Sequence, residues 1–98
     1  LLGDIISAAE AERIGLVSRV VPRADLDATV AELATRLADG PPLALSMTKR
    51  LLDNSAQLTL PQALEAEAQA QIVNFGTKDT AEAMLAFVEG REPRFLGS

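Results

Sequence analysis

The sequence contains no cysteine, histidine, tryptophan or tyrosine, and its only aromatic residues are three phenylalanines. The lack of cysteine and histidine excludes disulfides, thiolate nucleophiles, imidazole bases and the usual zinc sites, so no metal site is predicted. Few aromatic residues also means weak support for strands. No apolar run approaches the roughly 20 residues that span a bilayer, so no membrane partner is expected.

What the sequence does contain points to one small helical domain. Its 98 residues are 48 % hydrophobic, with alanine and leucine dominant, which favours helices. The net charge is −5, and the lysines and arginines are scattered without runs, so no nucleic-acid partner is expected. No signal peptide is apparent at the start of the chain, which makes a cytoplasmic location the expectation.

The opening of the chain is apolar and begins without methionine. Residues 1–6 read Leu-Leu-Gly-Asp-Ile-Ile, which is typical of a buried segment rather than of a solvated terminus. No partner for this segment is evident within the 98 residues. We therefore expect the chain to be a fragment whose apolar surface is covered by something else.

Local signals place a short helix and a strand near the start. Ser7 and Glu10 have the spacing of a capping box, and Gly15 suits the left-handed position that ends a helix. Residues 16–21 are rich in valine and stop at Pro22, which predicts a short strand.

Four further helices are predicted by apolar residues that recur every three or four positions. Two of them cover residues 23–39 and 42–55, separated by a Gly-Pro-Pro break. A third follows the capping box of Thr59 and Gln62 and ends at Gly76. The fold class predicted for the chain is therefore mostly α, with about five helices and one short strand.

The last helix is expected to start after Thr77 and to end at Gly90, with residues 94–98 as a tail. Its apolar face would consist of Ala81, Met84, Leu85 and Val88.

Pairs of glutamates are the only acid–base candidates, and their spacing is unsuitable. Glu65 and Glu67 point to different sides of a helix, and Glu82 and Glu89 lie about two turns apart. Solvated helix faces explain both pairs better than proton transfer does. The sequence thus predicts no catalytic residue in this chain.

One constellation could bind a ligand. Phe87 lies at the edge of the apolar stripe of the last helix, and Arg91 and Arg94 follow it. An aromatic ring beside guanidinium groups can stack on a base and hold phosphates. The alternative is that Phe87 only widens a packing face while the arginines keep the helix end soluble.

Several stretches of the sequence occur in an order that is typical of one family. Near the start these are Leu2-Gly3-Asp4, Ile6 to Ala11 and Ile14 to Pro22, and in the middle Pro42-Leu43-Ala44-Leu45 with Lys49. The terminal stretch adds Phe75, Asp79, Glu82, Ala86, Phe87, Arg91, Pro93, Phe95 and Gly97. On these pieces, which cover essentially the whole chain, the sequence resembles the C-terminal region of the enoyl-CoA hydratase/isomerase (crotonase) family.

The resemblance implies a fold and an activity. Residues 1–22 would end a crotonase core, an α/β spiral of β-β-α turns, and residues 23–98 would form a helical CoA-lid and trimerisation region. The catalytic N-terminal part would be absent. The family implies acyl-CoA as substrate and partner, without another cofactor. Hydration of 2-enoyl-CoA in fatty-acid metabolism and assembly into trimers or dimers of trimers are further implied.

The resemblance also assigns the two site residues, both for CoA binding. Phe87 matches an aromatic beside the CoA adenine. Gly90 stands where many members carry a basic residue, so Arg91 would supply the phosphate contact. A crotonase-family isomerase or decarboxylase, or a non-catalytic helical oligomerisation module, remain alternatives. The fragment alone is expected to be inactive.

Overall fold

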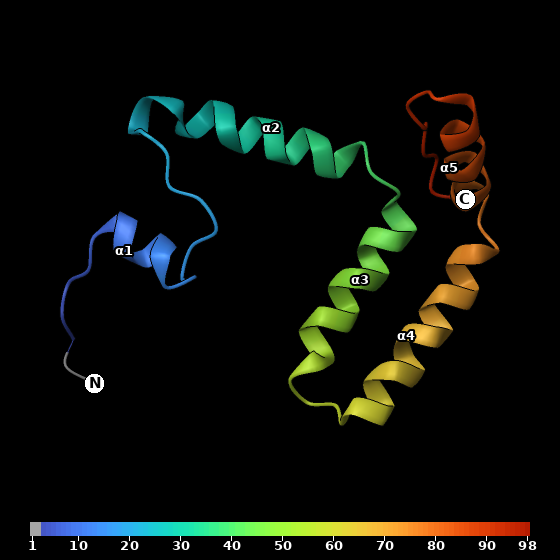
Figure 1. Ribbon diagram of the computed structural model, residues 1–98, viewed down its shortest axis with the longest axis horizontal. Helices are drawn as coiled ribbons and strands as arrows, with labels where there is room; N and C mark the ends of the chain where they lie inside the picture. Colours follow the sequence, from blue (N-terminus) through green and yellow to red (C-terminus); the bar gives the residue numbers. More distant parts are fainter. Residues whose placement is uncertain (1–2) are drawn as a thin grey trace. The chain divides into compact units, whose positions relative to one another are not determined.

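Helices form all of the regular structure that the computed structural model shows in residues 3–98, the part of the chain it describes (Figure 1). The order is α1 (Ala8–Arg13), a 3-10 turn (Arg23–Asp25), α2 (Leu26–Ala38), α3 (Pro42–Ser55), α4 (Leu60–Phe75) and α5 (Lys78–Glu89). The mostly α fold with five helices is confirmed. The chain divides into two compact units, and the boundary between them follows Ala34.

The first unit contains α1, and its caps follow the sequence. The Ser7 hydroxyl accepts the Glu10 N–H at 3.1 Å, and Gly15 adopts the left-handed φ of 75° beyond the helix end. Glu10 does not complete the capping box, because its carboxylate binds Arg13 within the same helix. Of the apolar opening segment, residues 1 and 2 lie outside the described residues, and Ile5 is fully exposed at 101 %. Ile5 thus has no packing partner among residues 3–98, as predicted.

The strand predicted for residues 16–21 is not formed, and residues 3–98 contain no strand at all. The N–H groups of Leu16 and Val17 both donate to the carbonyl of Ala11, at 2.8 and 3.3 Å. The Val20 N–H donates to the Glu12 carboxylate at 2.9 Å. Valine-rich sequence favours extended backbone, but a strand also needs a neighbouring strand to accept its hydrogen bonds, and the described chain offers none.

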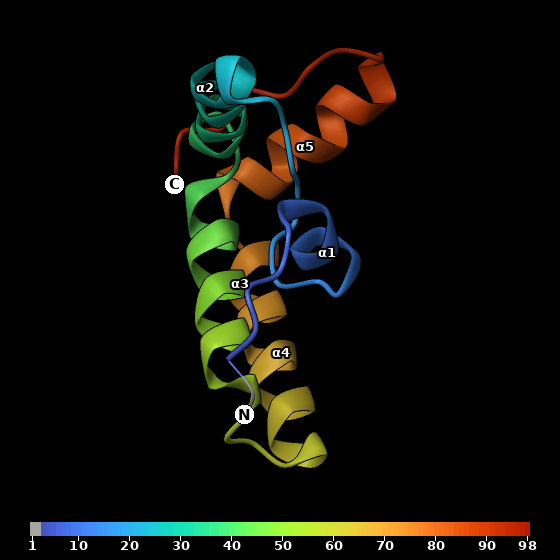
Figure 2. The ribbon, with the colours of Figure 1, turned by 90° about the vertical axis from the view of Figure 1, so that its left-hand side faces the viewer.

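The second unit is built on a hairpin of α3 and α4, which lie side by side in both views (Figures 1 and 2). Pro42 occupies the first turn of α3, where its missing N–H is tolerated. Gln62 reaches back from α4 to accept the Thr59 N–H at 2.9 Å, as the second capping box predicts. Met47, Leu51 and Leu58 are half-buried between the helices. α5 then packs on α4.

Large apolar side chains are exposed in both units, for example Leu16 at 69 % in the first and Ile72 at 73 % in the second. Within the described residues, Ala11 and Ala86 are the only buried apolar side chains. The helices therefore present apolar faces that this chain does not cover itself.

Candidate functional site

Phe87 lies near the end of α5 on a face that is open to solvent. Its side chain is 88 % exposed, and its neighbours Met84 and Val88 are 65 % and 82 % exposed. The face of α5 that the sequence predicted to pack, made of Ala81, Met84, Leu85 and Val88, is thus exposed in this chain. This exposure is compatible with both interpretations of Phe87, a stacking ring and part of a packing face, so its role stays a prediction.

The opposite face of α5 is the buried one. Asp79 is 4 % exposed and Ala86 is 1 % exposed, while Glu82 is half-buried between them. Positions 79, 82 and 86 are separated by three and four residues, so they lie on one side of the helix. Residues 91–98, which we call the strap, cover this side. They turn back at Gly90, whose left-handed φ of 67° permits the reversal.

Arg91 is the first residue of the strap, and its guanidinium is held by α5. Its Nη1 and Nη2 donate to the two carboxylate oxygens of Glu82 at 2.6 and 3.0 Å. Its Nε donates to Glu89 at 2.6 Å, and Nη1 also donates to the Glu92 carbonyl at 3.2 Å. Glu82 and Glu89, which the sequence places about two turns apart, both bind this one cation.

These contacts shift the pKa values of Glu82 and of Arg91, the residue predicted to bind phosphate. The two hydrogen bonds from Arg91 and the N–H of Arg94 lower the pKa of Glu82 to about 2. The same contact with Glu82, followed by that with Glu89, raises the pKa of Arg91 above its ordinary value. Arg91 is therefore a fixed cation whose charge is offset by two carboxylates.

Phe87 and Arg91 do not share a face of α5. Glu82, which holds Arg91, precedes Phe87 by five positions, which places them about 140° apart around a helix of 3.6 residues per turn. The structure thus brings the two predicted residues to the same end of α5 but on different sides. Their assignment to CoA remains a prediction.

Asp79 is the residue whose importance sequence reasoning missed. It lies in the first turn of α5, and its two carboxylate oxygens accept the N–H groups of Leu96 and Gly97 at 2.8 and 2.9 Å. In the sequence it appeared only as one member of the terminal motif. A capping signal at Thr77 placed an acid in the helix's first turn, but no pattern indicated that this acid binds residues so far along the chain.

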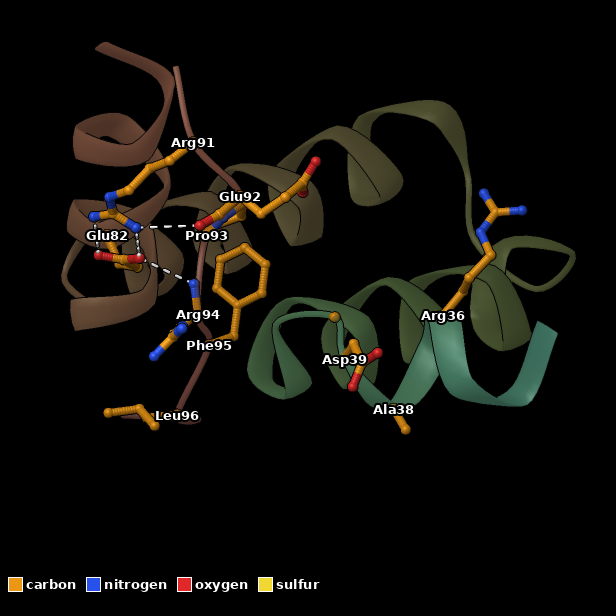
Figure 3. Close-up of a pocket in the computed structure, with 11 residues that line it drawn as sticks. Arg36, Ala38, Asp39, Glu82, Arg91, Glu92, Pro93, Arg94, Phe95 and Leu96 are labelled. Atoms are coloured by element: carbon orange, nitrogen blue, oxygen red, sulfur yellow. Dashed lines mark hydrogen bonds and ion pairs between the residues drawn. The ribbon is translucent and has the colours of Figure 1, made fainter. Parts of the chain in front are cut away.

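A broad open hollow of about 1390 Å³ lies beside the strap (Figure 3). The ring of Phe95 faces the last turn of α2 across it. Its charged lining residues are Arg36, Asp39, Glu82, Arg91, Glu92 and Arg94. The charges balance, and Glu82 is already engaged with Arg91. This lining offers no nucleophile, no base with a partner and no unpaired buried acid.

Residues 3–98 contain neither a metal-binding cluster nor a membrane-spanning helix. These residues contain no cluster of three or more acidic side chains that could hold a metal ion. None of their helices is both long and apolar enough to cross a membrane.

Comparison with known proteins gives one consistent result. Residues 1–98 match the family described as enoyl-CoA hydratase/isomerase. A relative named "Probable enoyl-CoA hydratase, mitochondrial" from Dictyostelium discoideum is 39 % identical over 95 % of this chain. The crotonyl-CoA hydratase of Syntrophomonas wolfei is 37 % identical, also over 95 % of the chain.

The helical arrangement is shared with solved structures as well. The enoyl-CoA hydratase of Bacillus anthracis superposes with a TM-score of 0.89 and 38 % identity over 95 % of this chain. In each case the chain spans only about a third of the relative's length: 34 %, 36 % and 36 % for the three proteins named.

Proposed function

The chain belongs to the enoyl-CoA hydratase/isomerase family, and we propose that it is the C-terminal helical part of an enzyme that hydrates 2-enoyl-CoA thioesters. The observation that carries the proposal is the match of residues 1–98 to the family model, together with the match of 95 % of the chain to relatives named as hydratases, of which the chain spans about a third.

In this proposal the chemistry belongs to residues outside the chain. Hydration needs an acid and a base near the double bond and donors for the developing oxyanion. The sequence has no histidine or cysteine, and the ion-paired carboxylate of Glu82 has a pKa of about 2, too low for a general base at neutral pH. The part in hand would instead bind the nucleotide end of the substrate and join subunits.

Phe87 would carry most of the nucleotide contact. Its exposed ring can stack on the adenine without any rearrangement of α5. Arg91 has five N–H donors, and four hydrogen bonds to Glu82, Glu89 and Glu92 use all but one of them. Arg91 would therefore have one N–H left to donate to a phosphate, and two carboxylates already offset its charge. Its contact with a phosphate would be weaker than that of a free arginine.

The first test is activity. The 98-residue chain alone should show no turnover of crotonyl-CoA above the buffer rate, followed by loss of the conjugated thioester absorbance. A chimera should be active in which residues 1–98 replace the matching region of the Bacillus anthracis enoyl-CoA hydratase. A soluble, folded chimera without hydratase activity would contradict the proposal, as would turnover by the chain alone.

The second test uses the same chimera and concerns Phe87. Loss of an aromatic stack on a base costs about 1–3 kcal/mol, so Phe87→Ala should raise KM for crotonyl-CoA about five-fold to a hundred-fold. The kcat should change little, because the nucleotide is bound alike in ground and transition states. Arg91→Ala should raise KM less.

Val88→Ala is the matched control, since Val88 is 82 % exposed in the same turn and has no assigned contact. A crotonyl-pantetheine substrate without the nucleotide should not distinguish Phe87→Ala from the parent chimera. If Val88→Ala and Phe87→Ala raise KM equally, Phe87 has no specific role in nucleotide binding.

Assembly is the second part of the proposed role. Exposed apolar side chains such as Leu52 at 68 % and Ile72 at 73 % offer surface that a homo-oligomer would cover, and trimers or dimers of trimers are the proposed state. The same surface also favours the alternative of a non-catalytic oligomerisation module. The inactive chimera described above would leave that alternative. Because the chemistry lies outside residues 1–98, a crotonase-family isomerase or decarboxylase would be recognised only in the whole protein that contains these residues, by turnover of the corresponding acyl-CoA. A role in fatty-acid metabolism, which the family resemblance implies, and a cytoplasmic location belong to the same proposal.

A further inference from the structure

We propose that the strap, residues 91–98, is a latch that fixes α5 on the start of α3, and that Asp79 is the residue that holds it closed. The inference concerns a conformational device and does not depend on any role in acyl-CoA binding. It rests on a set of hydrogen bonds in which strap and helix satisfy each other's backbone groups.

Asp79 supplies the first half of the latch. A carboxylate that is only 4 % exposed has lost most of its water and must be compensated by hydrogen bonds. Each of its oxygens accepts one strap N–H, from Leu96 at 2.8 Å and from Gly97 at 2.9 Å. Its place in the first turn of α5 adds the favourable interaction of a negative charge with a helix N-terminus.

The second half of the latch is a set of hydrogen bonds in the opposite direction, in which α5 donates and the strap accepts. The first N–H groups of a helix have no partner within the helix. At the start of α5 the N–H groups of Lys78 and Asp79 donate to the carbonyl of Ser98, at 2.7 and 3.3 Å. Docking the strap therefore satisfies groups on both sides, and undocking would leave Asp79 without its donors.

Further along α5 the strap is held at two more points. The Arg94 N–H donates to Glu82 at 2.9 Å, next to the ion pair of Glu82 with Arg91. The Arg91 N–H donates to the carbonyl of Ala86 at 3.1 Å. The strap is thus bound from one end of α5 to the other.

The docked strap also touches the start of α3. A Cβ built on Gly97 would lie 2.8 Å from Cγ of Pro42, so only glycine permits this approach. α5 packs on α4, and α4 packs on α3. The contact at Pro42 gives α5 a second attachment, which fixes its angle to the hairpin as well as its position. Figure 2 shows the strap returning to the start of α3.

Asp79→Asn is the decisive variant, because it keeps the side chain's size and removes one acceptor. Asparagine has one oxygen, and its amide group would face a second N–H donor. Loss of a charged hydrogen bond of this kind should speed amide hydrogen exchange at Leu96 and Gly97 about ten-fold or more. The matched control is Asp53→Asn, which removes the same charge from an exposed position on α3.

The position of α5 is measured separately with spin labels. The sequence has no cysteine, so Arg50→Cys on α3 and Val88→Cys on α5 give one label pair, diluted with unlabelled chain. The parent and Asp53→Asn should give one narrow distance distribution, and Asp79→Asn a broad one. Unchanged amide exchange and an unchanged narrow distribution in Asp79→Asn would overturn the proposal.

A second variant decides the matter if Asp79→Asn loses its helical circular dichroism. A stop codon after Phe95 removes the N–H groups of Leu96 and Gly97 that bind Asp79, and it also removes the Ser98 carbonyl. All of α5 stays unchanged. With helicity retained, this chain should show the broad distribution. A narrow distribution would mean that α5 is held by α4 alone, which overturns the latch.

Discussion

The strap on α5 and the hairpin of α3 and α4 are stabilised in opposite ways. The strap is held by directional bonds to carboxylates, and it buries Asp79 almost completely. The hairpin relies on apolar contact, yet grooves of about 340 and 280 Å³ remain beside Met47 and Leu51. Leu52 and Ile72 on its outer sides are 68 % and 73 % exposed. The strap finds its hydrogen-bond partners within this chain, whereas the hairpin leaves large apolar side chains exposed.

Gly97→Ala should be the most damaging of the single changes that test this contrast. Gly97 has a φ of 76°, and an added Cβ would lie 2.8 Å from Pro42. The left-handed backbone alone costs an alanine about 1–2 kcal/mol, and the contact adds to that. Urea unfolding followed by circular dichroism would measure the loss.

Gly76→Ala is the control for that measurement. Its φ of −82° is ordinary, and the nearest atom to an added Cβ is 3.5 Å away. We expect no loss, or a small gain from a less flexible unfolded chain. Equal losses in both variants would mean that the strap does not require glycine at position 97.

Thr59→Ala should weaken the hairpin without touching the strap. Loss of a helix N-cap residue costs about 1 kcal/mol, and here it also disturbs the bond between Thr59 and Gln62. Amide exchange should rise in the first turn of α4 and stay unchanged at Leu96 and Gly97. A parallel rise at both places would show that the two regions unfold as one.

Acid should leave the bond between the strap and Glu82 intact to unusually low pH. The pKa of Glu82 falls from 4.5 to about 2 in the folded chain because Arg91 and Arg94 bind its ionised form. The stabilisation is therefore fully present above pH 4.5 and is lost as the pH falls through about 2. Carboxyl chemical shifts should place the midpoint of Glu82 near 2 in the parent. Arg91→Ala should move it up, and a parent midpoint near 4.5 would show that the ion pair does not form in solution.

Phe87→Ala should have the smallest effect on stability. An 88 % exposed ring contributes little to folding, so the change should stay within about 0.5 kcal/mol. Ala86→Leu, one residue earlier on the buried face, should cost about 1–3 kcal/mol by overpacking. Similar thermal midpoints for both variants would remove the distinction between the two faces of α5.

The helices could be predicted from sequence because their signals are local. The Ser7 and Thr77 hydroxyls accept N–H groups only three residues along the chain. Gly15 has the left-handed φ predicted for it, and α5 ends at Gly90 as predicted. The prediction of a strand at residues 16–21 was wrong because its signal is not local. A strand forms only beside a neighbouring strand, which the local sequence does not reveal.

Neither the docking of the strap on α5 nor the ion pairs of Arg91 could be predicted from the sequence. The bonds of Asp79 join residues 17 and 18 positions apart, and the pair of Arg91 with Glu82 joins residues nine apart. Bonds from backbone N–H groups leave no periodic pattern in the side chains. Phe87 and Arg91 were singled out as an aromatic ring beside guanidinium groups and were assigned to CoA by resemblance to a family. Neither inference says which carboxylates a guanidinium contacts in this chain.

The short separation of those contacts bears on how the protein folds. Closing a loop costs entropy that grows with its length, and the strap closes on α5 through loops of 17 and 18 residues. Such a unit has low contact order and needs no distant segment to form. We therefore expect α5 and the strap to fold early and independently, before the apolar faces of the hairpin are buried.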